Sequence, residues 1–353
     1  EPTERLLARY SDIPQSLHTY SNGTPPGGVT AELVDVGKGL SGEDYAGKRV
    51  KGKLVLASGR GTVVHKEAVV KRGAAGVITH GLSYEFPGVR ERTDIPDAHA
   101  YQGIWPEAKD LKKVRFGFSL SKRQGNELRK HLADGKKVKL HATVDAGFCP
   151  GSYSVVSATI RGSEKPQDEI FLVAHLCHPK PSANDNASGS GLLIEVARTI
   201  SSLIRSGKIR RPRRTIRFLW VPETTGSVAF LARHPELHGR LKAGINLDMV
   251  GEDQTLCRST LTMDCTPDSL PSYLNDFVYS MIEQANVEYD PMVKIGMVSN
   301  FRCARTTYSG GSDHAEFNEA TVGAPCVGLT QWPDMFYHTS LDTIDKVSED
   351  SLR

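Results

Sequence analysis

The sequence lacks the features that mark several classes of protein. Its 353 residues contain no apolar run approaching the ~20 residues that span a lipid bilayer. Neither sign of charge dominates, because 44 Lys and Arg residues stand against 41 Asp and Glu residues, so a nucleic-acid-binding surface is not expected. Internal repeats and low-complexity tracts are absent. What remains is a globular composition in which 39% hydrophobic residues allow a sizeable core.

Cysteine is also scarce, with six residues and no C-x-x-C pair of the kind that binds structural zinc. A disulfide between Cys265 and Cys303 is compatible with the sequence, which does not decide it. The compartment stays open between secreted and cytoplasmic. No signal peptide is visible, but Glu1 is not an initiator methionine, so a leader could have been removed. The sequence predicts no oligomeric state.

The apolar pattern divides the chain near residue 150. Before that point, short β runs alternate with helical periodicity, and from residue 153 continuous apolar strands alternate with amphipathic helices. The second pattern is typical of a sheet covered by helices on both faces. We expect strands at 53–58, 77–79, 137–146, 154–160, 169–174, 215–221, 243–249 and 325–329, and helices at 62–71, 122–133, 188–206, 227–233, 269–285 and 313–319. The sequence therefore predicts an α/β fold in two parts.

Four acidic or histidine residues stand at or just after strand ends, and a fifth lies in the loop before a helix. His175 follows an apolar strand, and Asp185 lies ten residues later between two asparagines, just before a predicted helix. Glu223, Asp248 and His338 each come after a later strand. In open α/β sheets, ligands bind outside the carboxyl ends of the strands. We therefore expect these five side chains to converge at one edge of the sheet.

This set of residue types suits zinc. Imidazole nitrogens and carboxylate oxygens are the ligands of hydrolytic zinc sites, and a carboxylate can bridge two ions. Taken singly, a histidine after a strand is most often structural, and an aspartate there is most often a helix cap. Because all five candidates converge, we expect one or two zinc ions per chain. The expected ligands are His175, Asp185, Glu223, Asp248 and His338.

These residues resemble the motifs of the co-catalytic zinc exopeptidases, the aminopeptidase Y and bacterial leucyl aminopeptidase group. The matching segments are His175, 184–189, 246–251, 312–314 with Phe317, and 338–343. The resemblance covers about residues 153–353 in consistent order. It implies a zinc exopeptidase-type mixed sheet flanked by helices.

A second resemblance concerns the N-terminal part. Segments 50–56 and 71–78 look like the protease-associated domain that such enzymes often carry. This implies a linker or peptidase remnant at 1–29, a protease-associated-like α/β lobe at 30–148 that does no chemistry, and a catalytic domain at 149–353. In that family the peptidase fold begins before the inserted domain, so we expect an N-terminal portion to be missing from this chain.

The resemblance also assigns roles. His175 and Asp248 would hold one zinc and His338 the other, with Asp185 bridging the two ions. Tyr337 matches a tyrosine that stabilises the oxyanion in some relatives, which makes it a candidate catalytic residue.

Two positions depart from the family pattern. Cys177 stands where an aspartate usually supports the first histidine, and His178 is either a loop residue or an added ligand. Glu223 stands alone where the family usually has a general base followed by a zinc ligand. It is therefore either the base or the ligand, and we favour the ligand. Of the other acids, Glu252 and Asp253 follow the Asp248 strand.

The function implied is zinc-dependent hydrolysis of N-terminal residues from peptides, that is, an aminopeptidase. One alternative is a non-catalytic metal-binding or peptide-binding descendant, which the missing glutamate favours. Another is a carboxypeptidase-type or amide-cyclising relative. The preferred substrate side chain cannot be derived, because pocket walls come from loops without motifs.

Overall fold

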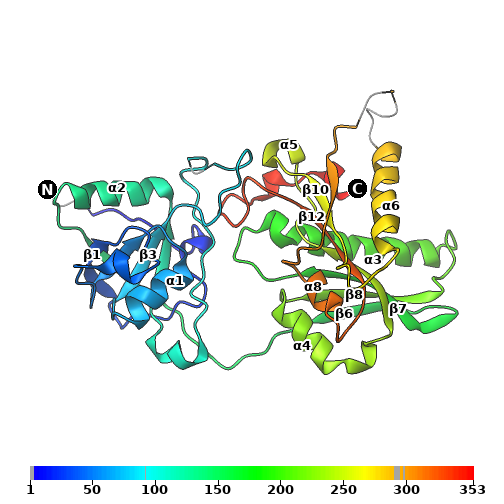
Figure 1. The fold of residues 1–353 in the computed structure, drawn as a ribbon, viewed down its shortest axis with the longest axis horizontal. Helices are drawn as coiled ribbons and strands as arrows, with labels where there is room; N and C mark the ends of the chain where they lie inside the picture. The colour runs from blue at the N-terminus through cyan, green and yellow to red at the C-terminus, as the bar shows by residue number, and fades with distance from the viewer. Residues whose placement is uncertain (1–3, 92, 290–294, 297–298) are drawn as a thin grey trace. The chain divides into compact units, whose positions relative to one another are not determined.

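The computed structural model describes residues 4–91, 93–289, 295–296 and 299–353, which form two compact units (Figure 1). The first unit comprises Glu1–Gly151, Pro179–Pro181 and His338–Asp342, and the second comprises Ser152–His178, Ser182–Tyr337 and Thr343–Arg353. Both are α/β, as predicted. Among the described residues, no helix has the length and hydropathy to cross a membrane.

The first unit is built on a five-stranded sheet in the order β4-β3-β2-β1-β5. Its strands are β1 (Val29–Asp35), β2 (Leu54–Ala57), β3 (Gly76–His80), β4 (Phe116–Leu120) and β5 (Lys139–Ala142). The first four are parallel, and β5 runs antiparallel to β1. Its helical segments are η1 (Pro14–Ser16), η2 (Gly42–Tyr45), α1 (Gly61–His65), η3 (Lys66–Val70), η4 (Ala108–Lys113) and α2 (Lys122–Ala133).

Strand β2 shows why this sheet is covered on both faces. Leu54 and Leu56 pack into one core cluster with Leu128 of α2, whereas Val55 and Ala57 pack into another cluster that α1 and η3 cover. Successive side chains of a strand point to opposite faces, so an unbroken apolar run needs a hydrophobic layer on each side. The segment before β1 also packs here, since the N–H of fully buried His18 donates to the Gly117 carbonyl.

The second unit is built on a seven-stranded sheet in the order β11-β10-β12-β9-β7-β8-β6. Its strands are β6 (Val156–Ile160), β7 (Lys165–His175), β8 (Arg214–Val221), β9 (Leu241–Leu247), β10 (Leu261–Asp264), β11 (Cys303–Thr306) and β12 (Cys326–Gln331). Strands β8, β7, β9 and β12 are parallel, while β6 and β10 run antiparallel to their neighbours β8 and β12. This is the mixed sheet that was predicted.

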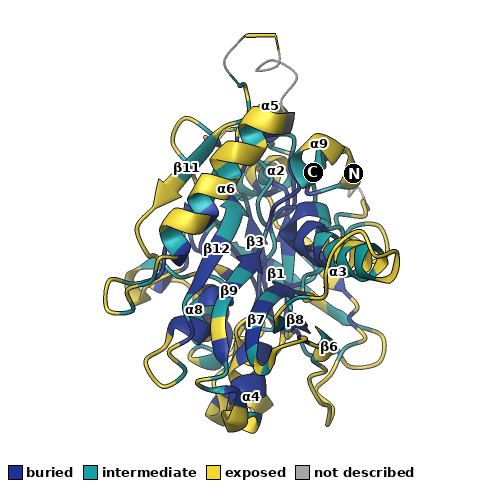
Figure 2. Cartoon of the chain, turned by 90° about the vertical axis from the view of Figure 1, so that its right-hand side faces the viewer, coloured by how far each residue is buried: buried dark blue, intermediate teal, exposed yellow. Residues whose placement is uncertain are grey.

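Helices cover both faces of this sheet. They are η5 (Ala183–Ser188), α3 (Gly189–Arg205), α4 (Thr225–Arg233), η6 (Pro235–Leu237), α5 (Gln254–Cys257), α6 (Leu274–Tyr289), α8 (His314–Asn318), η7 (Ile344–Lys346) and α9 (Glu349–Leu352). Phe171 and Val173 of β7 pack with residues of α4 and α8, and Ala174 packs with Leu193 of α3. Figure 2 shows the central strands buried, whereas α6 keeps an exposed outer face.

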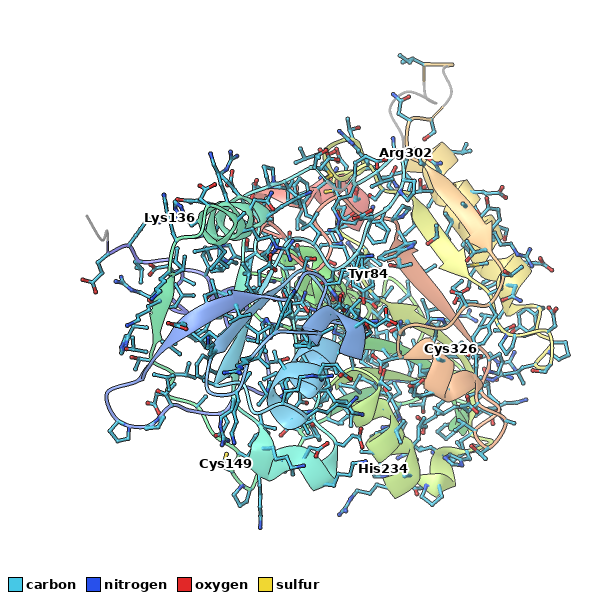
Figure 3. The ribbon with its side chains drawn as sticks, turned by 60° about the vertical axis from the view of Figure 1, so that its left-hand side comes forward. Tyr84, Lys136, Cys149, His234, Arg302 and Cys326 are labelled. Carbon is cyan, nitrogen blue, oxygen red and sulfur yellow. The ribbon has the colours of Figure 1, made fainter. Side chains whose placement is uncertain are left out.

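One expectation about detail needs correction, and the disulfide that the sequence left undecided can be settled. Helix α6 begins at Leu274 rather than at residue 269, because Pro271 disfavours the helical conformation of the preceding Leu270. The cysteines are all free, so Cys265 and Cys303 form no disulfide. Figure 3 labels the exposed Cys149 and the buried Cys326.

Candidate metal centre

The register of three neighbouring strands brings the candidate ligands to one level. Strand β7 lies between β8 and β9 and is parallel to both. His175, its last residue, pairs with Val221 of β8, so Glu223 lies just beyond that level. Val173 pairs with Asn246 of β9, which places Asp248 level with His175. The expected convergence at the carboxyl ends of parallel strands is therefore present for these residues.

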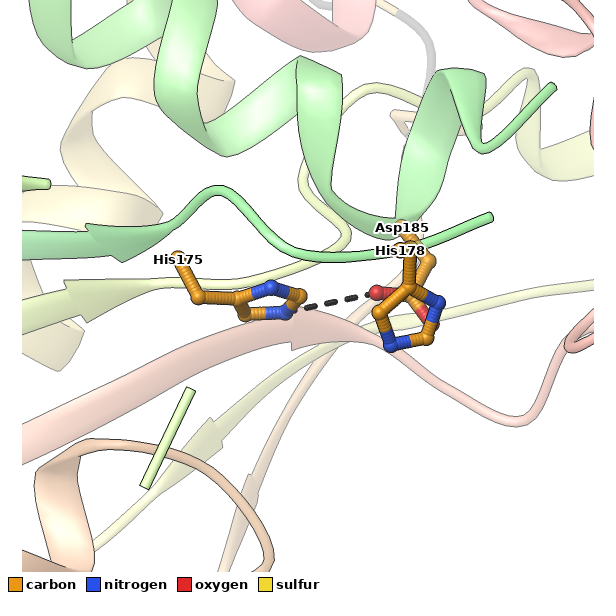
Figure 4. A group of neighbouring side chains, drawn as sticks. All are labelled: His175, His178 and Asp185. Carbon is orange, nitrogen blue, oxygen red and sulfur yellow. Dashed lines mark ion pairs between the residues drawn. The ribbon is translucent and has the colours of Figure 1, made fainter. Parts of the chain in front are cut away.

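The side chains meet closely. His175 Nε2 lies 3.3 Å from Asp185 Oδ1 (Figure 4). It also lies 3.0 Å from Asp248 Oδ1. His178 Nδ1 lies 3.4 Å from Asp185 Oδ2, and His178 Nε2 lies 3.9 Å from Glu223 Oε2. Asp185 thus contacts both histidines, one through each carboxylate oxygen. His178, which the sequence left between loop residue and ligand, is part of the cluster; its spacing of three residues from His175 was the signal.

The two asparagines beside Asp185 fix its loop to the loop that carries Asp248. The Asn186 amide donates to the Leu247 carbonyl at 2.9 Å, and its Oδ1 accepts from the N–H of Met249 at 3.1 Å. Asn184 Oδ1 accepts from the N–H of Gly251 at 3.1 Å. The Asn-Asp-Asn sequence therefore holds Asp185 close to Asp248.

Close packing at the start of α3 strengthens this arrangement. A Cβ at Gly189 would lie 2.3 Å from the Leu247 carbonyl oxygen, so only glycine lets the helix approach β9 this closely. The hydroxyl of Ser190 donates to the His175 carbonyl at 2.8 Å. The helix start is thus bonded to β7 and packed against β9.

The cluster carries an excess of negative charge in a buried place. Burial by itself would lower the pKa of His175, but the Asp248 and Asp185 carboxylates outweigh burial and raise that pKa well above its ordinary value. Burial likewise opposes the charge on His178, yet Asp185 and Glu223 raise the pKa of His178. The same negative charge that raises the pKa of these imidazoles also favours the binding of a cation.

Cys177 takes part in the site as an acceptor. Its Sγ accepts a hydrogen bond from the N–H of Glu223 at 2.9 Å and lies 4.0 Å from His175 Nδ1. The sulfur therefore faces the His175 nitrogen that is turned away from the carboxylates, at the sequence position where the family places an aspartate. It also fixes the backbone of the Glu223 turn.

Two further acids lie close to Glu223. Burial, opposed by hydrogen bonds from Ser227 and Thr224, raises the pKa of Asp313 to about 6. Burial and the neighbouring Asp313 raise the pKa of Glu316 to about 7. The sequence marked Asp313 only as part of a motif, and it gave no signal for Glu316.

Tyr337 and His338 are placed by other contacts. The Tyr337 ring lies 4.8 Å from that of Trp332. His338 belongs to the first unit, where its carbonyl accepts from the N–H of Tyr101 at 2.7 Å and its ring lies 5.0 Å from the Tyr101 ring. Their roles as oxyanion donor and zinc ligand stay predictions.

Glu252 and Asp253, the other acidic residues that follow β9, make contacts away from the histidine cluster. Asp253 caps α5 by accepting from the N–H groups of Thr255 and Leu256, both at 2.9 Å. Glu252 accepts from the Asn184 amide at 2.7 Å. It belongs to a separate buried group with Cys257 and Asp334, and no group of close ligand atoms found among the described residues joins it to His175.

Comparison with known proteins identifies the family to which this chain belongs. The sequence profile described as peptidase family M28 matches residues 155–353. The chain belongs to peptidase family M28. The match covers the second unit's sheet from β6 to the C-terminal helix and confirms the predicted resemblance to zinc exopeptidases.

Relatives of this M28 chain extend the comparison. It is 26% identical over 283 residues to a Clostridium acetobutylicum protein named for polysaccharide biosynthesis and an aminopeptidase-like domain, covering 77% of this chain and 56% of that protein. It is 24% identical over 364 residues to aminopeptidase YwaD of Bacillus subtilis, covering 97% and 68%. The chain thus spans little more than half the length of the first relative.

Solved structures show the same fold. A zinc aminopeptidase from Bacillus subtilis matches with a TM-score of 0.67 at 22% identity, covering 95% of this chain and 74% of that one. At this identity the likeness concerns the fold, and the roles of individual residues rest on the geometry above.

Proposed function

We propose that this chain is a zinc-dependent aminopeptidase that hydrolyses N-terminal residues from peptides. The observation that carries the proposal is the cluster of two histidines and three carboxylates at the carboxyl ends of β7, β8 and β9. Membership of a peptidase family and relatives named aminopeptidases support it.

The donor set fits zinc. Zinc bonds of 2.0–2.2 Å to nitrogen and oxygen place neighbouring tetrahedral ligands roughly 3.3 Å apart. The distances from His175 Nε2 to Asp248 Oδ1 and to Asp185 Oδ1, 3.0 and 3.3 Å, are of this size. Three carboxylates beside two neutral imidazoles also leave negative charge for a divalent cation to neutralise.

We assign the ligands as follows. His175 and Asp248 would hold one ion and His338 the other, with Asp185 bridging them. His178 offers the donor that the missing second glutamate would have supplied, because it contacts Asp185 at 3.4 Å. Glu223, whose side chain is 30% exposed, is then available as the general base. This assignment moves Glu223 from the ligand role favoured by the sequence toward the base role.

In this proposal, each residue of the site has a separate role in peptide hydrolysis. When bound, zinc polarises the scissile carbonyl and lowers the pKa of the attacking water. Glu223 accepts the proton of that water and returns it to the leaving amine. The hydroxyl of Tyr337 donates to the developing oxyanion. Negative charge around Glu223 suits the free α-ammonium group of a peptide, which favours attack at the N-terminus.

The N-terminal lobe has a different proposed role. We assign residues 30–148 to a protease-associated-like domain, between a linker or remnant at 1–29 and the catalytic domain at 149–353. Among the described residues, no group of close metal-ligand atoms lies within 30–148, which supports a role outside the chemistry.

The deciding experiment combines metal analysis with hydrolysis of amino-acid anilides. The proposal predicts bound zinc and chelator-sensitive release of the anilide product. The second candidate, a non-catalytic descendant, is favoured by the single glutamate and predicts bound zinc without hydrolysis. Release of amino acids from peptides that carry a free C-terminus but a blocked N-terminus would instead indicate a carboxypeptidase.

A further inference from the structure

Asp313 is a buried carboxylate that does not do what its position suggests. It is the N-cap residue of α8, where an aspartate usually accepts from the first N–H groups of its own helix. Here the side chain makes no such bond. Its Oδ1 instead accepts from the N–H of Thr224 at 2.9 Å and from the hydroxyl of Ser227 at 2.6 Å, while Oδ2 has no hydrogen-bond partner among the described residues.

The backbone that Asp313 holds is strained. Thr224 has φ 56° and ψ −63°, close to the values of roughly +75° and −65° for the rare γ-turn of positive φ. The hydrogen bond of that turn is present, since the N–H of Thr225 donates to the Glu223 carbonyl at 2.5 Å. A β-branched residue at positive φ is an outlier that persists only when its surroundings hold it.

This strained turn comes directly after the single glutamate. The N–H of Glu223 is held by Cys177 on one side, and the N–H of Thr224 is held by Asp313 on the other. The two peptide groups that flank the Glu223 Cα are thus tied to different segments of the second unit, and the direction of its side chain follows from them.

We propose that Asp313 is a positioning residue that holds the Thr224 γ-turn and thereby aims the Glu223 carboxylate at the reacting water. This inference rests on the proposed function of Glu223. The competing explanation is that Asp313 only caps the N-terminus of α4 from outside that helix, which would affect stability but not Glu223.

A double-mutant cycle separates the two explanations in the zinc-loaded protein. Asp313→Ala should lower kcat by about 10²-fold, the scale of a misplaced catalytic group, with little change in KM or zinc content. In a Glu223→Gln background, the same change should have almost no further effect, because Asp313 acts through Glu223. Asp313→Asn should recover most of the activity, since its amide oxygen can accept both bonds.

Hydrogen exchange provides a readout that does not depend on activity. In the metal-free protein, Asp313→Ala should speed exchange of the peptide that covers residues 223–227. If the unmodified zinc-loaded protein hydrolyses no anilide, the proposed function fails, while this exchange result still tests the inference. Should Asp313→Ala not fold, Asp313→Ser replaces it, because serine is too short to reach both Thr224 and Ser227.

Glu169→Gln is the matched control, a buried carboxylate in the first half of β7 that is bonded to Arg217 and Arg240. It should lower the melting temperature without changing kcat. Multiplicative losses in the Asp313→Ala/Glu223→Gln double variant would overturn the proposal; faster exchange at 223–227 would then leave Asp313 as a cap of α4, and unchanged exchange would show that it does not hold the turn either.

Discussion

Acid should unfold the first unit through its buried histidines. Burial, strengthened by the neighbouring His65, lowers the pKa of His18 from 6.5 to about 3. Burial, with Arg115, lowers the pKa of His65 from 6.5 to about 4. In the unfolded chain both rings bind a proton below pH 6.5, whereas in the folded unit they stay neutral. The contribution of these two histidines to the free energy of unfolding is therefore fully present above pH 6.5. It is lost as the pH falls toward their folded pKa values of about 4 and 3.

The magnitude follows from the pKa difference. Keeping a buried histidine neutral lowers the free energy of unfolding by about 1.36 kcal/mol for each pH unit below 6.5. His18 alone should therefore lower it by about 2 kcal/mol between pH 6.5 and pH 5. With His65, the loss at pH 5 should reach about 4 kcal/mol, a large part of the 5–15 kcal/mol that stabilises a typical domain.

The assay is urea unfolding at pH 7.5 and pH 5, with hydrogen exchange of the β1–β4 peptides to report on the first unit. His18→Gln removes the titrating ring while its amide can still reach Thr79 Oγ1, which lies 2.9 Å from His18 Nε2. The pH dependence should shrink by about 2 kcal/mol in this variant and stay unchanged in His141→Gln, whose ring is exposed. An unchanged pH dependence in His18→Gln would refute the reasoning.

Three further outcomes follow from the second unit. Glu223→Gln should keep its zinc and lose roughly 10²–10⁴ in kcat; normal zinc with normal turnover would exclude both proposed roles. Glu169→Gln should destabilise the protein by about 3 kcal/mol in urea unfolding, because Arg217 and the partly exposed Arg240 lose the charge of their buried partner; a change under 1 kcal/mol would show that the pair is solvated. Gly189→Ala should cost about 1–3 kcal/mol and weaken zinc binding, since its Cβ would meet the Leu247 carbonyl; an unaffected variant would mean that α3 can shift freely.

The central parallel strands of the second unit were predictable because apolar residues predominate in their segments, whereas β1 and β4 of the first unit were not predicted. Strands β7, β8, β9 and β12 all fall within the predicted segments or extend them by a few residues, and α2 begins and ends where its periodicity predicts. Strands β10 and β11 were not predicted. Each has four residues, and half or more of each strand is only partly buried or exposed, so neither alternation nor an apolar run marks them.

The candidate site shows the same division. His175, Asp185 and Asp248 could be placed from the sequence because strand ends and the Asn-Asp-Asn loop are local signals. The contacts of Cys177 and Asp313 with the Glu223 turn join segments 46 and 89 residues apart, and no local pattern encodes them. The proposed ligand role of His178 rests on its contact with Asp185 at 3.4 Å, which its spacing from His175 suggests but the folded loop defines.

Zinc content of the purified protein tests the central claim most directly. Asp185 contacts both histidines of the cluster, so its removal should damage the whole centre. Elemental analysis after zinc reconstitution and dialysis should find one or two zinc ions per chain in the unmodified protein. Asp253→Ala, which lacks only a helix cap, should bind the same amount. Asp185→Ala should lose zinc. Unmodified protein without bound zinc, or Asp185→Ala with its full complement, would contradict the account.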